Sequence, residues 1–148
     1  MNDVNPDYVV MGETENYSYD NVLRAINLVR RGARLIGCNP DLSGPVEEGI
    51  APGTGALISP VELATGRKAY FVGKPNPLMM RSAVKKLQCN AEETVIIGDR
   101  MDTDIIAGIE SEIDTCLVLS GITAANEINQ YAYSPKFILN GVVDIINP

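Results

Sequence analysis

Three acidic residues that directly follow an apolar run are the first feature of this sequence with an obvious chemical use. Residues 95–104 read VIIGDRMDTD, so Asp99, Asp102 and Asp104 fall within six positions after a strand-like segment. Carboxylate oxygens suit Mg²⁺, which keeps several waters and binds one or two protein carboxylates together with substrate phosphate. Helix capping is the alternative, because acids in the first turn of a helix are favoured electrostatically. The pattern alone leaves both interpretations open.

Lys74 is the second residue with chemical potential. It lies in VGKPNP, between a strand-like run and two prolines. Its compact ammonium group could pair with a phosphate oxygen or with a neighbouring carboxylate, although an exposed turn lysine fits the same pattern. The acidic cluster one strand later favours the functional role, because ligands of parallel sheets gather at the carboxyl ends of the strands.

Other nucleophilic chemistry is restricted by composition. The chain contains no histidine, which excludes Ser-His-Asp and Cys-His systems and histidine-ligated zinc. No arginine stands six residues after Cys38, Cys89 or Cys116, so a thiol phosphatase loop is also excluded. We interpret the three cysteines as small core or near-core residues. Their odd number and wide spacing favour a reducing compartment, and we expect a cytoplasmic protein.

Short strand-like runs alternate with amphipathic segments along most of the chain. The expected strands are residues 8–11, 33–37, 69–72, 94–97, 115–119 and 136–139, and the expected helices are residues 19–31, 77–87, 102–109 and 124–131. Gly32 and Gly66 are expected helix stops. The alternation predicts an α/β fold with a parallel sheet covered by helices. Residues 40–60 are rich in Pro and Gly, which predicts an extended loop before a short helix.

Length and charge narrow the class of protein further. The 148 residues suffice for one domain or two small lobes. A net charge of −7 argues against binding to a nucleic-acid backbone. No apolar run approaches the roughly 18–20 residues that a membrane span needs. We therefore expect neither a nucleic-acid nor a membrane partner.

Taken in order, several segments resemble the haloacid dehalogenase (HAD) superfamily, in its NagD-like and 4-nitrophenylphosphatase-like branch. They read GCNPD, PGTGAL, ATGRKAYFVGKPNPLMM, IIGDRMDTDIIAGI and LVLSGIT. The resemblance implies a HAD-like, Rossmann-type fold in which residues 1–68 form an α/β cap-like lobe and residues 69–148 the C-terminal half of the core. It also implies a Mg²⁺-dependent phosphatase that hydrolyses small phosphorylated substrates.

The same resemblance assigns roles to individual residues. Asp99 is similar to the metal ligand of the family, and Asp104 to the second acid, which orients metal-bound water or the lysine. Lys74 resembles the lysine that neutralises the substrate phosphate and the aspartyl nucleophile. The substrate-binding residues that the resemblance implies are Asn39, Asp41, Lys74, Arg100 and Thr103.

One part of the family pattern is missing. The nucleophile motif D-x-D-G-T, which precedes the cap in relatives, is absent, as is the hydroxyl-bearing second motif. We therefore expect a fragment of a phosphatase that is inactive alone. A non-catalytic α/β module that binds a phosphate ligand or a partner chain remains an alternative. So does a Rossmann-like domain with another role, in which the acidic turn is ordinary capping.

The missing motif also has a consequence for assembly. In the family, the strand that carries the nucleophile lies beside the strand that ends here at Gly98. Its absence predicts an open, apolar strand edge, which favours self-association. We expect a homo-oligomer, or lobes that pack differently from the family pattern.

Overall fold

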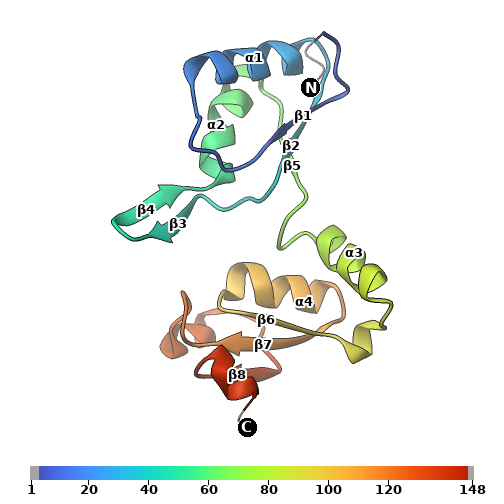
Figure 1. The fold of residues 1–148 in the computed structure, drawn as a ribbon, viewed down its shortest axis with the longest axis vertical. Helices are drawn as coiled ribbons and strands as arrows, with labels where there is room; N and C mark the ends of the chain where they lie inside the picture. The colour runs from blue at the N-terminus through green and yellow to red at the C-terminus, as the bar shows by residue number, and fades with distance from the viewer. Residues whose placement is uncertain (1–3, 147–148) are drawn as a thin grey trace. The chain divides into compact units, whose positions relative to one another are not determined.

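The computed structural model describes residues 4–146, and the chain divides into two compact units between Gly73 and Lys74 (Figure 1). The sequence-based boundary lay between residues 68 and 69. The difference arises because strand β5 (Tyr70–Phe71) pairs with the sheet of the first unit. No helix among the described residues is long and apolar enough to cross a membrane.

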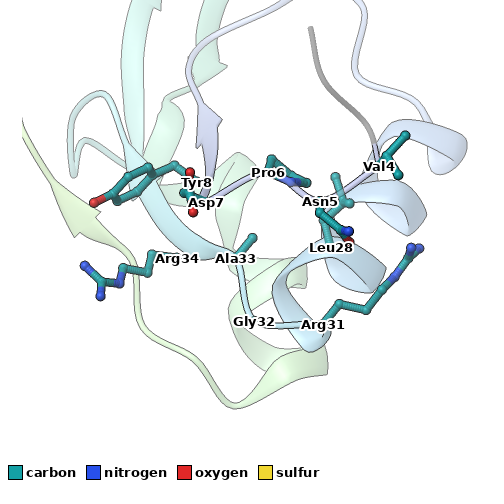
Figure 2. Close-up of a pocket in the computed structure, with 10 residues that line it drawn as sticks. All are labelled: Val4, Asn5, Pro6, Asp7, Tyr8, Leu28, Arg31, Gly32, Ala33 and Arg34. Carbon is teal, nitrogen blue, oxygen red and sulfur yellow. The ribbon is translucent and has the colours of Figure 1, made fainter.

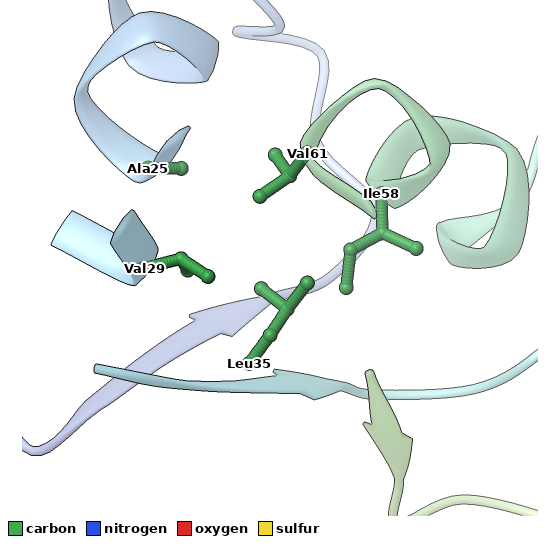
Figure 3. Packing of buried hydrophobic residues seen from close by; sticks show 5 residues of the cluster. All are labelled: Ala25, Val29, Leu35, Ile58 and Val61. Carbon is green, nitrogen blue, oxygen red and sulfur yellow. The ribbon is translucent and has the colours of Figure 1, made fainter. Parts of the chain in front are cut away.

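The first unit is a three-stranded parallel sheet packed against two helices. Its sheet has the order β1-β2-β5, with β1 (Tyr8–Met11) and β2 (Arg34–Gly37) joined by helix α1 (Tyr19–Arg30). Helix α2 (Thr54–Thr65) packs beside α1. The core between the helices and the sheet consists of Ala25, Val29, Leu35, Ile58 and Val61 (Figure 3).

Local sequence signals account for the helix ends. The side chain of Ser18 accepts a hydrogen bond from the backbone N–H of Asn21 and so caps the start of α1. Helix α2 ends at Gly66, as expected, because this residue has a φ of 68°, in the left-handed region that favours glycine. The other expected stop, Gly32, follows the end of α1 and has a φ of 120°.

The prediction of an extended loop over residues 40–60 was wrong. Strands β3 (Ser43–Val46) and β4 (Gly49–Pro52) form an antiparallel hairpin, with Gly49 at a φ of 130° after the turn. The prolines and glycines concealed it, since neither strand shows the apolar alternation of a half-buried strand. Helix α2 is also longer than the short helix that was expected.

The second unit is a separate three-stranded parallel sheet, of order β6-β7-β8, with helices beside it. Its elements are α3 (Pro77–Leu87), β6 (Val95–Gly98), α4 (Ile106–Glu110), β7 (Asp114–Val118) and β8 (Phe137–Leu139). Met101–Ile105 form a π-helical turn that continues into α4, where one helix over 102–109 was predicted. The predicted helix over 124–131 is a 3₁₀ helix, Ala125–Gln130. The α/β fold class is confirmed.

Strand β6 lies at the edge of its sheet and is partly exposed, although three of its four residues are apolar. Among the described residues it pairs with β7 alone. Ile96 packs against the cluster of Met80, Ala107 and Ile113, whereas Val95 and Ile97 are 46% and 44% exposed. The open, apolar edge that was expected from the absence of the nucleophile strand is therefore present at β6.

The interpretation of the cysteines as core residues holds only for Cys116. That residue is buried in β7, and burial raises the pKa of its thiol. Cys38 and Cys89 are exposed, because Cys38 follows the carboxyl end of β2 and Cys89 follows the end of α3. All three thiols are free.

Candidate active site

The candidate site lies at the carboxyl end of β6, where the chain passes from Gly98 into the π-helical turn. A Cβ built on Gly98 would lie 2.2 Å from Cγ and 2.3 Å from Cβ of Asp104. The residue does not have a positive φ. Glycine is therefore required here by the close approach of Asp104, and not by a left-handed backbone conformation.

Asp104 is a buried carboxylate with every oxygen engaged. Its side chain is 5% exposed, and Oδ1 forms an ion pair with Nζ of Lys74. Oδ2 accepts hydrogen bonds from the backbone N–H groups of Asp99 at 3.2 Å and Arg100 at 3.1 Å. Asp104 thus ties Lys74 to the end of β6. The lysine side chain itself is 43% exposed, so its ammonium group retains access to a ligand.

Asp99 presents a carboxylate that is only half engaged. Its Oδ2 accepts a hydrogen bond from the backbone N–H of Ile122 at 2.8 Å. Within residues 4–146 no hydrogen bond engages Oδ1, and the residue is partly exposed. A carboxylate oxygen that is not engaged in a hydrogen bond is the kind of donor that a hard cation takes.

Asp102 is committed to a different partner. Arg100 donates from Nε to Oδ1 at 3.0 Å and from Nη2 to Oδ2 at 2.8 Å, a two-bond guanidinium–carboxylate pair. This hydrogen bonding, with the nearby positive charge, lowers the pKa of the Asp102 carboxyl below its usual value. The acid is therefore paired within its own turn.

The acids of this turn do not replace the missing nucleophile motif. Asp102 and Asp104 have the D-x-D spacing, but Ile105 and Ile106 follow them in place of Gly-Thr. Both carboxylates are also engaged, by Arg100 and by Lys74.

The remaining expected site residues lie in two places. Thr103 is buried within the π-helical turn. Asn39 and Asp41 belong to the first unit, beyond the carboxyl end of β2. There Nδ2 of Asn39 donates to Glu13 Oε1 at 3.1 Å, and the Asp41 N–H donates to Asn39 Oδ1 at 3.2 Å.

The described residues hold no cluster of three or more Asp, Glu, Cys or His side chains that could by themselves enclose a metal ion. This donor set still fits Mg²⁺, which is commonly held by one or two protein carboxylates with water and phosphate oxygens in the remaining positions. Asp99 supplies such a carboxylate. It would not fit a structural Zn²⁺, which needs a closed set of nitrogen and sulfur ligands.

The first unit contains a cavity of about 610 Å³, and none of the expected site residues lines it (Figure 2). It is found at the amino ends of β1 and β2, between Asp7, Tyr8, Arg31 and Arg34. The guanidinium carbon of Arg34 lies 5.9 Å from the centre of the Tyr8 ring. Ligands of parallel sheets bind at the carboxyl ends, so this cavity is not part of the candidate site.

Sequence reasoning missed the loop at residues 120–123, which follows β7. Its Ile122 N–H holds Asp99, and Thr123 Oγ1 accepts a hydrogen bond from the Met101 N–H at 3.2 Å. LVLSGIT contributed only to the family resemblance. The glycine just beyond an apolar strand could have indicated a close backbone approach.

Comparison with known proteins places these features in a family. A family model described as HAD-hydrolase-like matches residues 71–145. The chain belongs to the haloacid dehalogenase superfamily. It is 46% identical over 145 residues to dihydroxyacetone phosphatase of Corynebacterium glutamicum, covering 98% of this chain and 53% of the relative. It is 43% identical over 145 residues to ribonucleotide monophosphatase NagD of Escherichia coli K12, covering 98% and 57%.

Solved structures agree with this assignment to the HAD superfamily. NagD from Escherichia coli K-12 matches with a TM-score of 0.89 and 42% identity, over 97% of this chain and 56% of that one. A 4-nitrophenylphosphatase from Thermotoga maritima matches with a TM-score of 0.93 and 31% identity, over 100% and 57%. The NagD-like resemblance is confirmed. The HAD chain spans about half the length of the curated relatives that it matches.

Proposed function

We propose that this HAD chain provides the cation-binding and phosphate-neutralising side of a Mg²⁺-dependent phosphate monoester hydrolase that acts on small phosphorylated substrates. The observation that carries the proposal is the arrangement at the end of β6. There the Lys74–Asp104 ion pair stands beside Asp99, whose Oδ1 has no hydrogen bond among the described residues. The names of the relatives, which are phosphatases, support the same reaction class.

Each residue of this group has a proposed task. Asp99 would hold the cation through Oδ1, and a bound Mg²⁺ supplies charge neutralisation to phosphate oxygens. Asp104 fixes the position of Lys74 through the ion pair. An ammonium group has three N–H donors, so Lys74 can donate to a phosphate while it stays bound to Asp104.

Fewer observations support a role in substrate binding for the other expected site residues. Arg100 lies beside Asp99 in the chain and has its guanidinium group turned to Asp102. Thr103 is buried, which suits support of the turn more than contact with a substrate. The proposal that Asn39 and Asp41 bind substrate rests on the family resemblance alone.

Hydrolysis through an aspartyl intermediate needs a nucleophile that this group does not contain. The D-x-D-G-T motif is absent, and the acids of the turn are paired or assigned to the cation. Loss of a nucleophile costs many orders of magnitude in rate. We therefore propose that the chain alone does not turn over phosphate esters. A non-catalytic module that binds a phosphate ligand is the alternative that this absence favours.

Direct calorimetric titration with Mg²⁺ tests the cation site, using the whole chain and the Asp99→Asn variant. We expect binding to the unaltered chain and a loss of at least about tenfold in affinity for the variant, because the ligating carboxylate is gone. Equal heats from both proteins would mean that the acids are ordinary helix caps, and the proposed function would be abandoned. Hydrolysis of an aryl phosphate, measured in parallel with and without Mg²⁺, separates an enzyme from a binding module.

A further inference from the structure

The loop at residues 120–123 makes three hydrogen bonds to the strand end and acidic turn, and all of them lie within the second unit. The Ile122 N–H donates to Asp99 Oδ2 at 2.8 Å, and the Thr123 N–H donates to the Asp99 carbonyl at 3.0 Å. In return, Thr123 Oγ1 accepts a hydrogen bond from the Met101 N–H at 3.2 Å. Asp99 is therefore held through both its side chain and its backbone.

Gly121 makes this contact possible. A Cβ on Gly121 would lie 2.1 Å from Oδ2, 2.4 Å from Cβ and 2.5 Å from Cγ of Asp99. The position of Asp99 Cβ is set by its backbone, so no change of side-chain rotamer would relieve the overlap. Any larger residue at position 121 must displace either the loop or Asp99.

Thr123 and Tyr133 hold the peptide groups of Met101 from two directions. Thr123 is buried, and its hydroxyl oxygen is the acceptor for the Met101 N–H. The Tyr133 O–H donates to the Met101 carbonyl at 3.0 Å. A turn that is held at both peptide groups keeps the residues before it, including Asp99, in one orientation.

We propose that Gly121 and Thr123 are positioning residues for the cation site. The loop occupies Oδ2 of Asp99 with a backbone N–H, and this leaves Oδ1 as the oxygen presented to Mg²⁺. Groups that orient a ligating carboxylate typically contribute about 10–100-fold to metal affinity. This inference rests on the proposed function, because it assumes that Asp99 holds the cation.

The test is the Mg²⁺ affinity of the whole chain, measured by calorimetry together with the thermal transition of each variant. Thr123→Val keeps the shape of the side chain and removes the acceptor, whereas Thr123→Ser keeps the hydroxyl. We expect about a tenfold or greater loss of affinity for Thr123→Val and recovery to within about threefold for Thr123→Ser. A residue that only supported folding would lower the thermal transition without this dependence on the hydroxyl.

Gly121→Ala gives a second, independent variant, for which Gly141→Ala is the matched control. A Cβ on Gly141 meets nothing closer than Ser120 at 3.7 Å, and its φ of −162° is open to any residue. We expect weakened Mg²⁺ binding for Gly121→Ala and no change for Gly141→Ala. If Gly121→Ala does not fold, the two Thr123 variants decide the matter.

The outcomes separate the two proposals. If Asp99→Asn weakens Mg²⁺ binding while folded Thr123→Val and Gly121→Ala bind like the unaltered chain, the positioning role is overturned and the cation site stands. If Asp99→Asn binds Mg²⁺ as the unaltered chain does, both proposals are overturned together.

Discussion

At the scale of single residues, the ion pair between Lys74 and Asp104 links two segments that are far apart in sequence. Asp104 is 5% exposed and has two further hydrogen bonds, from the backbone N–H groups of Asp99 and Arg100. A buried charge is costly when its partner is removed, and much less so when both partners become neutral. The contribution of the ion pair to stability can therefore be tested by substituting one of the two residues and then both.

We expect Lys74→Met to destabilise the chain by about 1–3 kcal/mol, because it leaves the Asp104 carboxylate buried without its cation. Adding Asp104→Asn should recover part of that loss, with a coupling of about 1 kcal/mol between the two sites. Urea unfolding followed by circular dichroism measures both effects. Additive losses would show that the ammonium group does not stabilise Asp104.

Asp102 provides a prediction for the dependence on pH. Hydrogen bonds from Arg100 lower the pKa of this carboxyl in the folded chain. A lowered pKa contributes stability at pH values above the unfolded-state pKa, near 3.9, and this contribution is lost as the pH falls through the folded-state pKa. Asp102 should therefore have no effect on the slope of stability against pH near neutrality.

Arg100→Gln should raise the pKa of Asp102 back toward its usual range, because both donors of the guanidinium group are removed. Carboxyl-carbon NMR titration of both proteins follows the Asp102 group directly. An Asp102 titration that is unchanged in Arg100→Gln would show that another group lowers its pKa.

At the scale of elements, β6 combines an open edge with apolar side chains. Among the described residues it pairs only with β7, and Val95 and Ile97 are exposed. Unpaired edges of this kind add strands from other chains unless a charge or proline blocks them. We accordingly propose that the chain is a homo-oligomer in solution.

Ile97→Lys should shift the chain toward the monomer, because a charged side chain on the edge strand disfavours pairing with another copy. Ile50→Lys is a suitable control, since Ile50 is an exposed isoleucine of strand β4 in the other unit. Light scattering coupled to size-exclusion chromatography measures the mass. A monomeric unaltered chain at all concentrations would contradict the proposal.

The elements that sequence reasoning found are amphipathic helices and short strands rich in apolar residues. Helices α1 and α3 fall within a residue of their expected limits, since the side chains of Ser18 and Asn76 cap their starts. The β3–β4 hairpin was missed because its strands contain Pro and Gly and expose Val46 and Ile50. The loop at residues 120–123 was missed because its contacts with Asp99 come mainly from backbone N–H groups, which leave no side-chain pattern.

At the scale of the whole molecule, the sequence indicated two units and the structure shows a sheet in each. The acidic turn, the lysine that pairs with it and the loop that holds Asp99 all belong to the second unit, residues 74–148. A cation bound to Asp99 therefore joins β6, the π-helical turn and the loop after β7, and its effect on stability should be felt by the second unit.

Binding to the folded chain alone stabilises it by about 2.7 kcal/mol when the free ligand is at 100 times its dissociation constant. For a unit of this size, we expect saturating Mg²⁺ to raise the thermal transition by several degrees. NaCl at the same ionic strength is the control for screening by salt, and Asp99→Asn should remove the Mg²⁺ effect. Neither the first sheet nor its cavity contains Asp99. When Mg²⁺ is added, the Tyr8 signal in a two-dimensional NMR spectrum should therefore stay fixed, whereas the signals of Asp99 and Ile122 should shift. Shifts confined to residues near Tyr8 would place the cation elsewhere and contradict the assignment of Asp99.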